Sequence, residues 1–532
     1  MIQNPILPGF CPDPSIIRVK EDYYIAVSTF EWWPGVRLYH SKDLEHFEQL
    51  ASPLNRVSQL NMIGNPDSCG VWAPDISWDG EFYWLIYTDV KTRNGGLFNT
   101  HNYLVKSEDM RGGWSEPVFI NSSGFDPSLF HDTDGKKYVV TMINGFHGIL
   151  VQEYDPVKEC LVGNPKKVYP GTGRAFTEGP HIYHIGEYYY LLMAEGGTSY
   201  EHMVTMARSH SIWGPYEADP GNPVLTSDPE NPDAPQKCGH GDLVCTQNGE
   251  WYLVHLGSRP PEGTRQCVLG RETFLQKMIW NEEGWLRLAC GGRYAQYETE
   301  KPKGIPEFCF PKQEEKDFGC DDFALLKDRI RYTSLRTPCD EFAAWDERFG
   351  YLRLYGQESL NSCFCVSLIA RRQQARLVQV ETCVEFEPVC REQAAGLAYL
   401  YDTRNFYLLV KTNENTVGEV SGKSVLKLLR SCNGEVTEAA EATEVPAKGE
   451  LYLRARTVQE GLMVQFFYSL DGREYRMLNE VPTDILTDEH CVGFTGAHFG
   501  MYCHDMTGQR RYADFPYFEI KKGISGEERR DT

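Results

Sequence analysis

This chain of 532 residues has no excess of positive charge, because its formal net charge is −22. A nucleic-acid surface needs lysine and arginine clustered against phosphates, so the composition argues against a nucleic-acid partner. No apolar run approaches the roughly 20 residues of a membrane-spanning helix. The first residues also show no basic segment followed by an apolar one. We therefore expect neither a membrane partner nor a secretion signal.

Paired cysteine motifs and helical periodicity are also absent. The 17 cysteines are odd in number, scattered, and include no CxxC pair. Reduced, unpaired thiols are typical of the cytoplasm, which is the location that the sequence predicts. Through the repeated part of the chain, no stretch keeps apolar residues at a period of 3.6 over three turns. The sequence therefore predicts an all-β protein.

A short repeat is what the chain does contain. A turn with a carboxylate leads into a strand, and a glycine or acidic turn then leads into an aromatic-rich strand. The copies start at Asp13, Asp75, Asp126, Glu178 and Asp242. Repeats of roughly 40–50 residues with short strands are typical of propeller blades. We therefore predict a five-bladed β-propeller over residues 1–300, with these acids gathered at a common site.

The repetition stops before residue 300, and the composition then changes. Residues 301–321 are charged and contain proline, which is typical of a linker. Residues 322–521 again alternate strands and turns without intervening helices, so we predict a β-sandwich of the concanavalin or jelly-roll type. Residues 522–532 form a polar tail for which we expect disorder.

Three of the repeated acids are candidates for catalysis. An aspartate before proline is an ordinary turn former, but Glu178 is a longer acid on a different, Gly-Pro turn. Acids held close together raise one another's pKa, which is costly unless the acids are used. Glycoside hydrolysis needs one ionised and one protonated carboxyl at the scissile bond. Asp13, Asp126 and Glu178 supply such a pair and a third acid that tunes it.

At these acids the chain resembles glycoside hydrolase family 43. The motifs that carry the resemblance are Pro8–Ser15, Gly70–Ile76, Gly124–Phe130 and Thr177–His181. Within the family, Val492–Met501 and Ala513–Glu519 resemble the closing stretch of the β-xylosidase branch, which carries a C-terminal β-sandwich. The resemblance covers nearly all of residues 1–520.

The resemblance implies an inverting, exo-acting β-1,4-xylosidase that releases xylose from the non-reducing end of short xylo-oligosaccharides. It makes Asp13 the general base that activates water and Glu178 the general acid that protonates the leaving oxygen. Asp126 is then the acid that raises the pKa of Glu178 and holds it in position. A homo-oligomer, either a dimer or a tetramer, is also implied.

The resemblance further implies substrate-binding roles for Arg271, Trp72, Phe30, His240, His498 and Phe499. Arg271 matches an arginine that binds sugar hydroxyls, whereas Trp72 and Phe30 match apolar walls. The loop with His498 and Phe499 is expected to bring the sandwich to the active site and close it. No cofactor is required on this interpretation. His240 matches a histidine near the propeller axis that touches a bound cation or water in parts of the family, so Ca²⁺ there is an alternative.

Two other functions stay open at this point. Family members share the acids and differ in the walls of the site, so an α-L-arabinofuranosidase, or an enzyme that acts on both pentosides, is the first alternative. A non-catalytic sugar-binding propeller is the second, and it predicts the loss of one of the three acids. The motifs of the related five-bladed fructan hydrolases, Asn-Asp-Pro-Asn and Glu-Cys-Pro, are missing.

Overall fold

The structure is a computed structural model that describes residues 1–93, 98–310, 318–419 and 422–523. It divides into two compact units. The first comprises residues 1–60, 69–263 and 271–311, and the second comprises residues 61–68, 264–270 and 312–532. Most of the predicted polar tail lies outside the described residues. None of the helices in the described part of the chain is long and apolar enough to cross a membrane.

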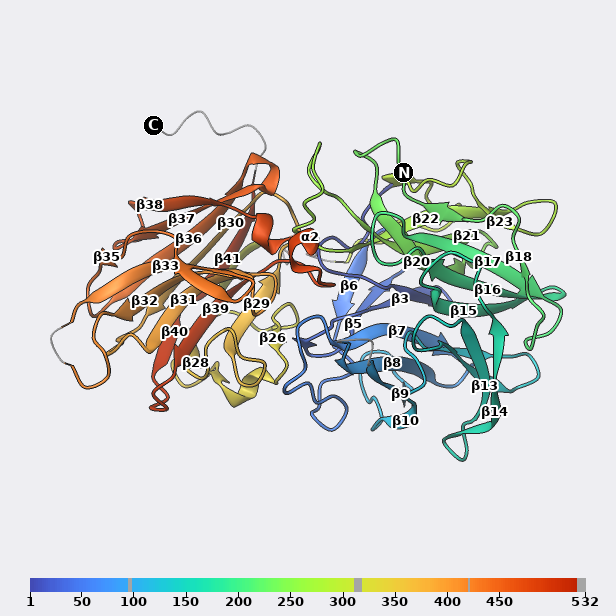
Figure 1. The fold of residues 1–532 in the computed structure, drawn as a ribbon, viewed down its shortest axis with the longest axis horizontal. Helices are drawn as coiled ribbons and strands as arrows, with labels where there is room; N and C mark the ends of the chain where they lie inside the picture. The colour runs from blue at the N-terminus through green and yellow to red at the C-terminus, as the bar shows by residue number, and fades with distance from the viewer. Residues whose placement is uncertain (94–97, 311–317, 420–421, 524–532) are drawn as a thin grey trace. The chain divides into compact units, whose positions relative to one another are not determined.

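The first unit contains five antiparallel sheets, which are the blades of the predicted propeller and are coloured blue to green in Figure 1. Blade 1 has β2 (Ser15–Val19), β3 (Asp22–Val27), β5 (Arg37–Ser41) and β6 (Phe47–Leu50). Blade 2 has β7 (Gly70–Trp78), β8 (Tyr83–Thr92), β9 (Asn99–Ser107) and β10 (Val118–Asn121). Blade 3 has β11 (Ser128–His131), β12 (Lys137–Met142), β13 (Ile149–Asp155) and β14 (Cys160–Tyr169).

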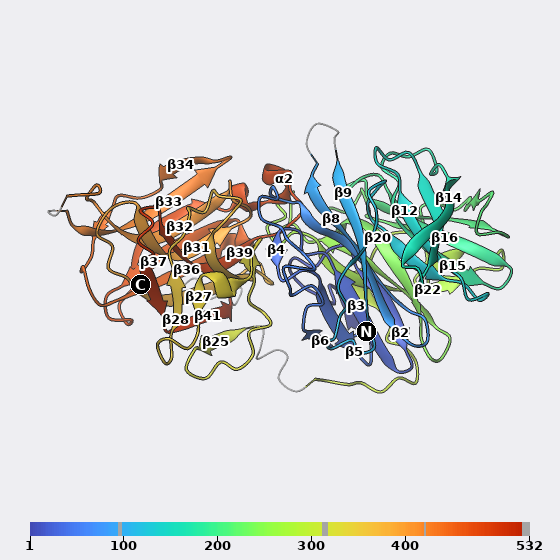
Figure 2. The ribbon, with the colours of Figure 1, turned by 90° about the horizontal axis from the view of Figure 1, so that it is seen from below.

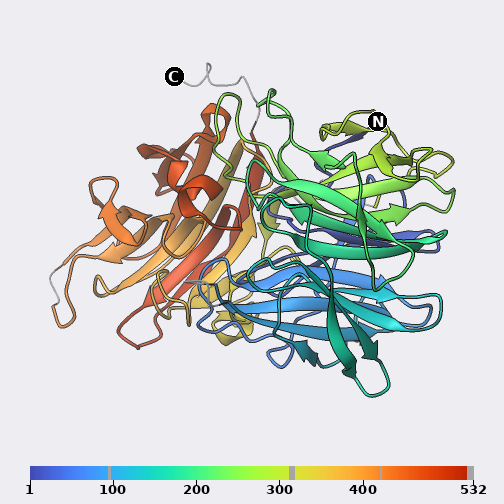
Figure 3. The same cartoon turned by 45° about the vertical axis from the view of Figure 1, so that its right-hand side comes forward.

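The last two blades follow the same order of strands. Blade 4 has β15 (Glu178–Ile185), β16 (Tyr188–Glu195), β17 (Met203–Ser209), β18 (Glu217–Ala218) and β19 (Leu225–Thr226). Blade 5 has β20 (Gln236–Cys245), β21 (Trp251–Ser258), β22 (Glu272–Trp280) and β23 (Leu286–Leu288). The unit also holds β1 (Ile2–Gln3), β4 (Trp32–Trp33) and β24 (Glu298–Thr299). Figure 3 shows successive blades from another side.

The sequence of each blade accounts for its strands. The second strands, such as β3 and β21, are aromatic and aliphatic runs that are almost entirely buried, as expected for strands covered on both faces. Tight turns join them to the first strands. Gly80, for example, adopts a φ of +102° in the turn between β7 and β8, a conformation that glycine reaches at little steric cost.

The first strands of the blades lie beside one another around the centre of the unit. β2 contacts β7, β7 contacts β11, β11 contacts β15, and β15 contacts β20, which returns to β2. The N-terminal segment reinforces this closure, because Leu7 and Thr273 exchange two main-chain hydrogen bonds of 3.2 Å. Cys11 also donates to the carbonyl of Arg271 (2.9 Å). The start of blade 1, dark blue in Figure 2, is thereby joined to blade 5.

The second unit is the predicted β-sandwich. One sheet contains β25 (Gly319–Asp322), β27 (Ala343–Ala344), β28 (Leu352–Tyr355), β30 (Val378–Glu385), β36 (Glu450–Val458), β37 (Met463–Ser469), β38 (Arg476–Pro482), β40 (Tyr512–Phe515) and β41 (Tyr517–Lys522). The other contains β29 (Ser367–Arg372), β31 (Gln393–Leu400), β32 (Phe406–Asn413), β33 (Ser424–Cys432), β34 (Glu435–Glu438), β35 (Thr443–Glu444) and β39 (His498–Asp505). β26 (Ser334–Leu335) and the short helices η2 (Cys339–Glu341), η3 (Gln459–Gly461), η4 (Asp484–Leu486) and α2 (Asp488–Cys491) complete the unit.

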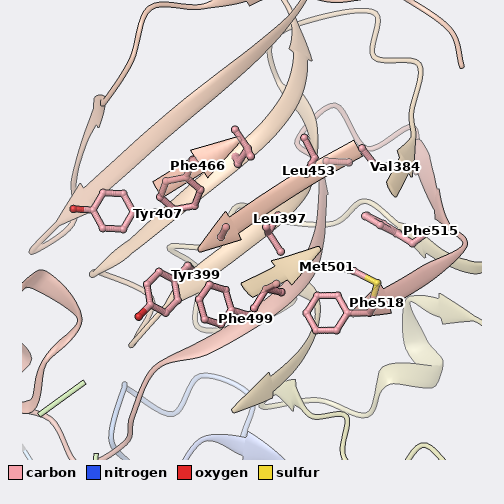
Figure 4. Close-up of a cluster of buried hydrophobic side chains, with 14 of the residues drawn as sticks. Val384, Leu397, Tyr399, Tyr407, Leu453, Phe466, Phe499, Met501, Phe515 and Phe518 are labelled. Atoms are coloured by element: carbon pink, nitrogen blue, oxygen red, sulfur yellow. The ribbon is translucent and has the colours of Figure 1, made fainter. Parts of the chain in front are cut away.

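Side chains from both sheets form one core between them, shown in Figure 4. Leu453 and Phe466 come from one sheet, and Leu397, Tyr399 and Phe499 come from the other. Each such side chain contributes about 1.5–3 kcal/mol when it is fully buried. This face-to-face packing is the reason why the alternating apolar pattern of the C-terminal half folds as a sandwich.

The boundary between the units differs from the one predicted in three places, one of which is residues 301–310 of the predicted linker, which belong to the first unit. The sequence places residues 61–68 and 264–270 in the propeller, but they belong to the second unit. Arg336, which is 2% exposed, holds the first of these segments through an ion pair with Asp67 (2.7 Å). Ala497 donates a main-chain hydrogen bond of 2.9 Å to the second. Contacts made by distant parts of the chain therefore set this boundary.

Candidate active site

In or just before the first strand of each blade, an equivalent residue has its backbone in the left-handed region. These residues are Asp13 (φ 53°), Ala73 (φ 31°), Asp126 (φ 50°), Gly179 (φ 55°) and His240 (φ 44°). Such angles are uncommon outside glycine, and non-glycine residues that adopt them are often found at functional sites. The shared conformation identifies the equivalent positions of the five blades.

The lead acids of the sequence repeat are not all equivalent. Two residues after each left-handed position stand Ser15, Asp75, Ser128, His181 and Asp242. The hydroxyl of Ser15 lies 3.1 Å from Asp75 and 3.0 Å from Asp242, so these two acids form a group of their own. Only Asp13 and Asp126 occupy the left-handed position, and Glu178 directly precedes it. The expectation that all five acids share one site is therefore wrong.

Asp13 is a buried carboxylate held by three side chains. Arg271 donates to its Oδ1 (2.9 Å), Ser28 donates to its Oδ2 (2.6 Å), and Nδ1 of His240 lies 3.8 Å from its Oδ1. Burial by itself raises the pKa of Asp13, but Arg271, His240 and the Ser28 hydrogen bond outweigh burial and lower it. Asp13 is therefore ionised at neutral pH, as a base or a nucleophile must be.

Asp126 and Glu178 behave in the opposite way. Burial, together with the charge of Asp13, raises the pKa of Asp126 to about 8. Burial and the charges of Asp126 and Asp13 raise the pKa of Glu178 well above its usual value. The one backbone donor described for Asp126 is the amide of Gly179 (3.2 Å). This pair therefore keeps a proton at neutral pH, beside an acid that does not.

Aromatic rings lie next to the acids. The guanidinium of Arg271 sits over the ring of Phe30 at 5.5 Å from its centroid. The Phe30 ring lies 6.0 Å from Trp72, and Trp72 meets Phe125 edge-on at 5.3 Å. Apolar faces beside hydrogen-bonding groups suit the ring of a sugar. The structure thus gathers Arg271, Phe30 and Trp72 at the acids, as predicted from the sequence.

His240 lies at the same place and is uncharged. Burial is the main cause that lowers its pKa to about 4, against the opposing effect of Asp13. Its ring packs against the backbone of Gly179, where a Cβ atom would come within 2.8 Å of Nε2. Residue 179 must therefore be glycine for the imidazole to fit between Asp13 and the Glu178 segment.

The two candidates from the sandwich are neighbouring residues of β39, and both are buried. Phe499 is 1% exposed and stacks on Tyr399 with their centroids 3.9 Å apart, inside the core shown in Figure 4. Its ring therefore stabilises the sandwich, and the expectation that it binds substrate is corrected by this packing. Nδ1 of His498 lies 2.8 Å from the carbonyl of Gly496, to which it is hydrogen-bonded, and the residue is fully buried, so a role in substrate binding stays a prediction.

Sequence reasoning missed Ser28 and Phe125. The Ser28 hydroxyl accepts a hydrogen bond from the amide of Ala73 (2.7 Å). Its own proton therefore points toward the Asp13 carboxylate, to which it donates. Nothing in the sequence marks this serine, because its partners come from two blades. Phe125 stands directly before Asp126 in the repeat, and this position next to a candidate acid could have identified it as a residue of the site.

Two family models match the chain. The one described as "Glycosyl hydrolases family 43" matches residues 2–286, which include the three acids. The one described as "Beta xylosidase C-terminal Concanavalin A-like domain" matches residues 320–521. The two matches coincide with the strands of the propeller and of the sandwich.

Individual proteins resemble the chain over nearly its full length. It is 45% identical to "Beta-xylosidase" of Bacillus subtilis (strain 168), over 98% of this chain and 99% of that protein. It is 43% identical to "Xylosidase/arabinosidase 43B" of Humicola insolens, over 97% of each. The crystal structure of xylan beta-1,4-xylosidase from Bacillus halodurans C-125 is 45% identical and superposes with a TM-score of 0.93, covering 98% of this chain and 100% of that one. By its sequence, its two domains and its fold, this chain belongs to glycosyl hydrolase family 43.

Proposed function

We propose that this enzyme is an inverting β-1,4-xylosidase that releases xylose from the non-reducing end of short xylo-oligosaccharides. The observation that carries the proposal is the opposite effect of the site on its carboxyls, since the pKa of Asp13 is lowered and the pKa of Glu178 is raised. The names of the relatives from Bacillus subtilis and Bacillus halodurans support xylose as the sugar that is released.

The chemistry follows from these two protonation states. Asp13 takes a proton from a water molecule as the water oxygen attacks the anomeric carbon. Glu178 gives its proton to the glycosidic oxygen as the bond from that oxygen to the anomeric carbon breaks. Attack from the face opposite the leaving group turns a β-linkage into α-xylose. Burial and the neighbouring carboxyls of Asp126 and Asp13 favour the protonated form of Glu178 until the leaving oxygen takes the proton.

Arg271 has two tasks in this scheme. Its bond to Asp13 (2.9 Å) favours the ionised base, and the family resemblance assigns it the recognition of sugar hydroxyls. Phe30, under the guanidinium, and Trp72, beside Phe30, offer apolar surface to the sugar ring. The release of one sugar from a chain end rests on the family resemblance and stays a prediction.

Hydrolysis of xylobiose followed by proton NMR tests substrate and mechanism together. We expect the first anomeric signal to be that of α-xylose, followed by mutarotation to the β anomer. A first signal from β-xylose would contradict inversion, and no hydrolysis at all would contradict the proposed substrate. Chromogenic β-xylopyranoside and α-L-arabinofuranoside substrates, compared in parallel, report the balance between the two pentosides.

A second activity on α-L-arabinofuranosides is favoured by one observation. The relative from Humicola insolens is named a xylosidase/arabinosidase, and its match extends over 97% of this chain. Both sugars are pentoses cleaved with the same pair of acids, so the walls of the site decide between them. A non-catalytic sugar-binding propeller is disfavoured, because all three acids are present with perturbed pKa values.

The pH dependence of kcat/KM follows from the same shifts. A lowered pKa keeps Asp13 ionised in acid, so the acid limb is expected below the ordinary range of an aspartate. A raised pKa keeps the proton on the Asp126–Glu178 pair, so the basic limb is expected only above about pH 8. Rates measured from pH 3 to 10 check this. A basic limb near pH 5 would show that the general acid has an ordinary pKa.

A bound cation is not required on our proposal. Ca²⁺ takes six to eight oxygen ligands, and the groups of potential ligands found among the described residues do not include His240. Arg271 already supplies the positive charge beside Asp13. We expect dialysis against EDTA to leave kcat unchanged. A loss that added Ca²⁺ restores, but Na⁺ does not, would assign a cation to the site.

Location and assembly complete the proposal. We propose a cytoplasmic enzyme, which is supported by the absence of a disulfide among the cysteines, all of which lie in the described part of the chain. We also propose a homo-oligomer, a dimer or a tetramer, on the strength of the family resemblance.

A further inference from the structure

A second set of charged side chains is buried at the centre of the propeller. Nδ1 of His181 lies 3.3 Å from Oδ1 of Asp75 and 3.8 Å from Oδ1 of Asp242. All three residues are at most 8% exposed. We call these three residues and Ser15, whose hydroxyl lies near both carboxylates, the central cluster. No step of the proposed reaction uses it.

The central cluster joins the first strands of all five blades. Asp75 is on β7 and accepts the amide of Leu129 from β11 (2.8 Å). Asp242 is on β20 and accepts the amide of Ile16 from β2 (2.7 Å) and the hydroxyl of Tyr183 from β15. Each oxygen of both carboxylates thus has a hydrogen-bond donor from another blade or within its own strand.

His181 carries the positive charge of the central cluster. Burial alone lowers the pKa of its imidazole, but Asp242 and then Asp75 outweigh burial and raise it to about 9. Without a positive charge beside them, the two buried carboxylates of Asp75 and Asp242 would repel each other strongly. The imidazolium therefore supplies the positive charge beside the two acids.

Short stretches of chain connect the central cluster to the catalytic acids. Ser15 follows Asp13 by two residues, and His181 follows Glu178 by three on the same strand, β15. The third acid is reached through space, because the charge of His181 favours the ionised form of Asp126. A shift of the central cluster would therefore move or recharge each of the three acids.

We propose that His181 is a positioning residue for the glycosidase reaction. Its imidazolium fixes the first strands of the blades, and with them the segments that carry Asp13 and Glu178, although it touches no reacting atom. The inference rests on the proposed function for its kinetic part only. The charge state of His181 can be tested without any substrate.

The kinetic test uses a double variant, Asp75→Asn/His181→Gln. His181→Gln alone leaves two buried carboxylates without a cation and is liable to unfold, whereas the double variant removes one charge of each sign and keeps side chains that hydrogen-bond. We expect it to fold, with kcat on xylobiose lowered by about 100-fold through misplacement of the acids and with KM little changed. The optimum of kcat/KM should move to higher pH, because Asp126 loses a positive neighbour and keeps its proton longer.

The matched control is Asp132→Asn/His184→Gln, which removes the same two residue types. His184 lies on the same strand as His181 and pairs with Asp132 at 3.1 Å, nearer the surface. The control should keep the wild-type kcat and pH profile. If the central double variant also keeps the wild-type kcat and pH profile, whatever its melting temperature, His181 plays no part in positioning the acids and our proposal is overturned.

NMR of the wild-type enzyme labelled with ¹⁵N-histidine tests the charge directly. We expect one imidazole to keep the ¹⁵N shifts of an imidazolium at pH 8, and to be missing from the spectrum of the double variant. The proposal is overturned if no such histidine exists, whatever substrate the enzyme hydrolyses. Failure of the proposed function would instead be seen as absence of pentosidase activity in the wild type with this signal still in place.

Discussion

Glu178→Gln is expected to lower kcat on xylobiose by about 1,000-fold, which corresponds to about 4 kcal/mol of transition-state stabilisation. The amide has nearly the shape of the acid but no proton to give to the leaving sugar oxygen. A 2,4-dinitrophenyl β-xyloside needs no such proton, so its kcat should fall by no more than about tenfold. Steady-state kinetics on the two substrates measure the difference.

The control for this variant is Glu187→Gln, an exposed glutamate in the turn between β15 and β16. It makes the same chemical change in the same blade and should leave both rates unaltered. Equal losses on both substrates in Glu178→Gln would show that Glu178 is not the general acid. A wild-type rate on xylobiose would remove it from the reaction altogether.

Asp13→Asn is expected to lower kcat by about 1,000- to 10,000-fold on both substrates alike. The base acts on water, so the quality of the leaving group does not change its contribution. KM should change by only a few fold, since Arg271, Phe30 and Trp72 still surround the sugar. Loss of the carboxylate also removes one charge that raises the pKa of Glu178, so the basic limb should move to lower pH.

Asp134→Asn, in an exposed turn of blade 3, is the matched control and should behave as the wild type. The leaving-group dependence separates the two catalytic variants: Glu178→Gln discriminates between the substrates and Asp13→Asn does not. An Asp13→Asn enzyme that hydrolyses the activated xyloside at the wild-type rate would assign the base to another residue.

The strands and their repetition could be predicted from the sequence, because they depend on local patterns. Aromatic and aliphatic runs such as β3 and β21 lie between glycine or acidic turns at every repeat. That arrangement sets a blade whatever surrounds it. Leu453 and Phe466, in the C-terminal half, belong to strands in which buried and partly exposed residues alternate. That alternation is also visible in the sequence.

The grouping of the acids could not be predicted from the repeat. Asp75 and Asp242 stand in similar motifs to Asp13 and Asp126, but two residues beyond the left-handed position of their blades. Register shifts between Trp72 and Asp75, and around Gly239, accompany that difference. β-Bulges re-aim side chains, and a sequence pattern does not show which way a bulged residue faces.

That residues 61–68 belong to the second unit also could not be predicted from the sequence. These residues lie between two blades along the chain, yet Arg336, far along the chain, holds Asp67 through an ion pair. Phe499 is a similar case, since its position in a family motif suggested binding but its stacking on Tyr399 places it in a core.

The order of residues alone determined that this chain forms five small sheets and a sandwich, and it identified three carboxyl groups as candidates for catalysis. Which of those groups gives up its proton was decided only when the ring of strands closed and brought Arg271 to Asp13. An acid's affinity for its proton depends on burial and on neighbouring charges, and here those neighbours come from opposite ends of the propeller's sequence.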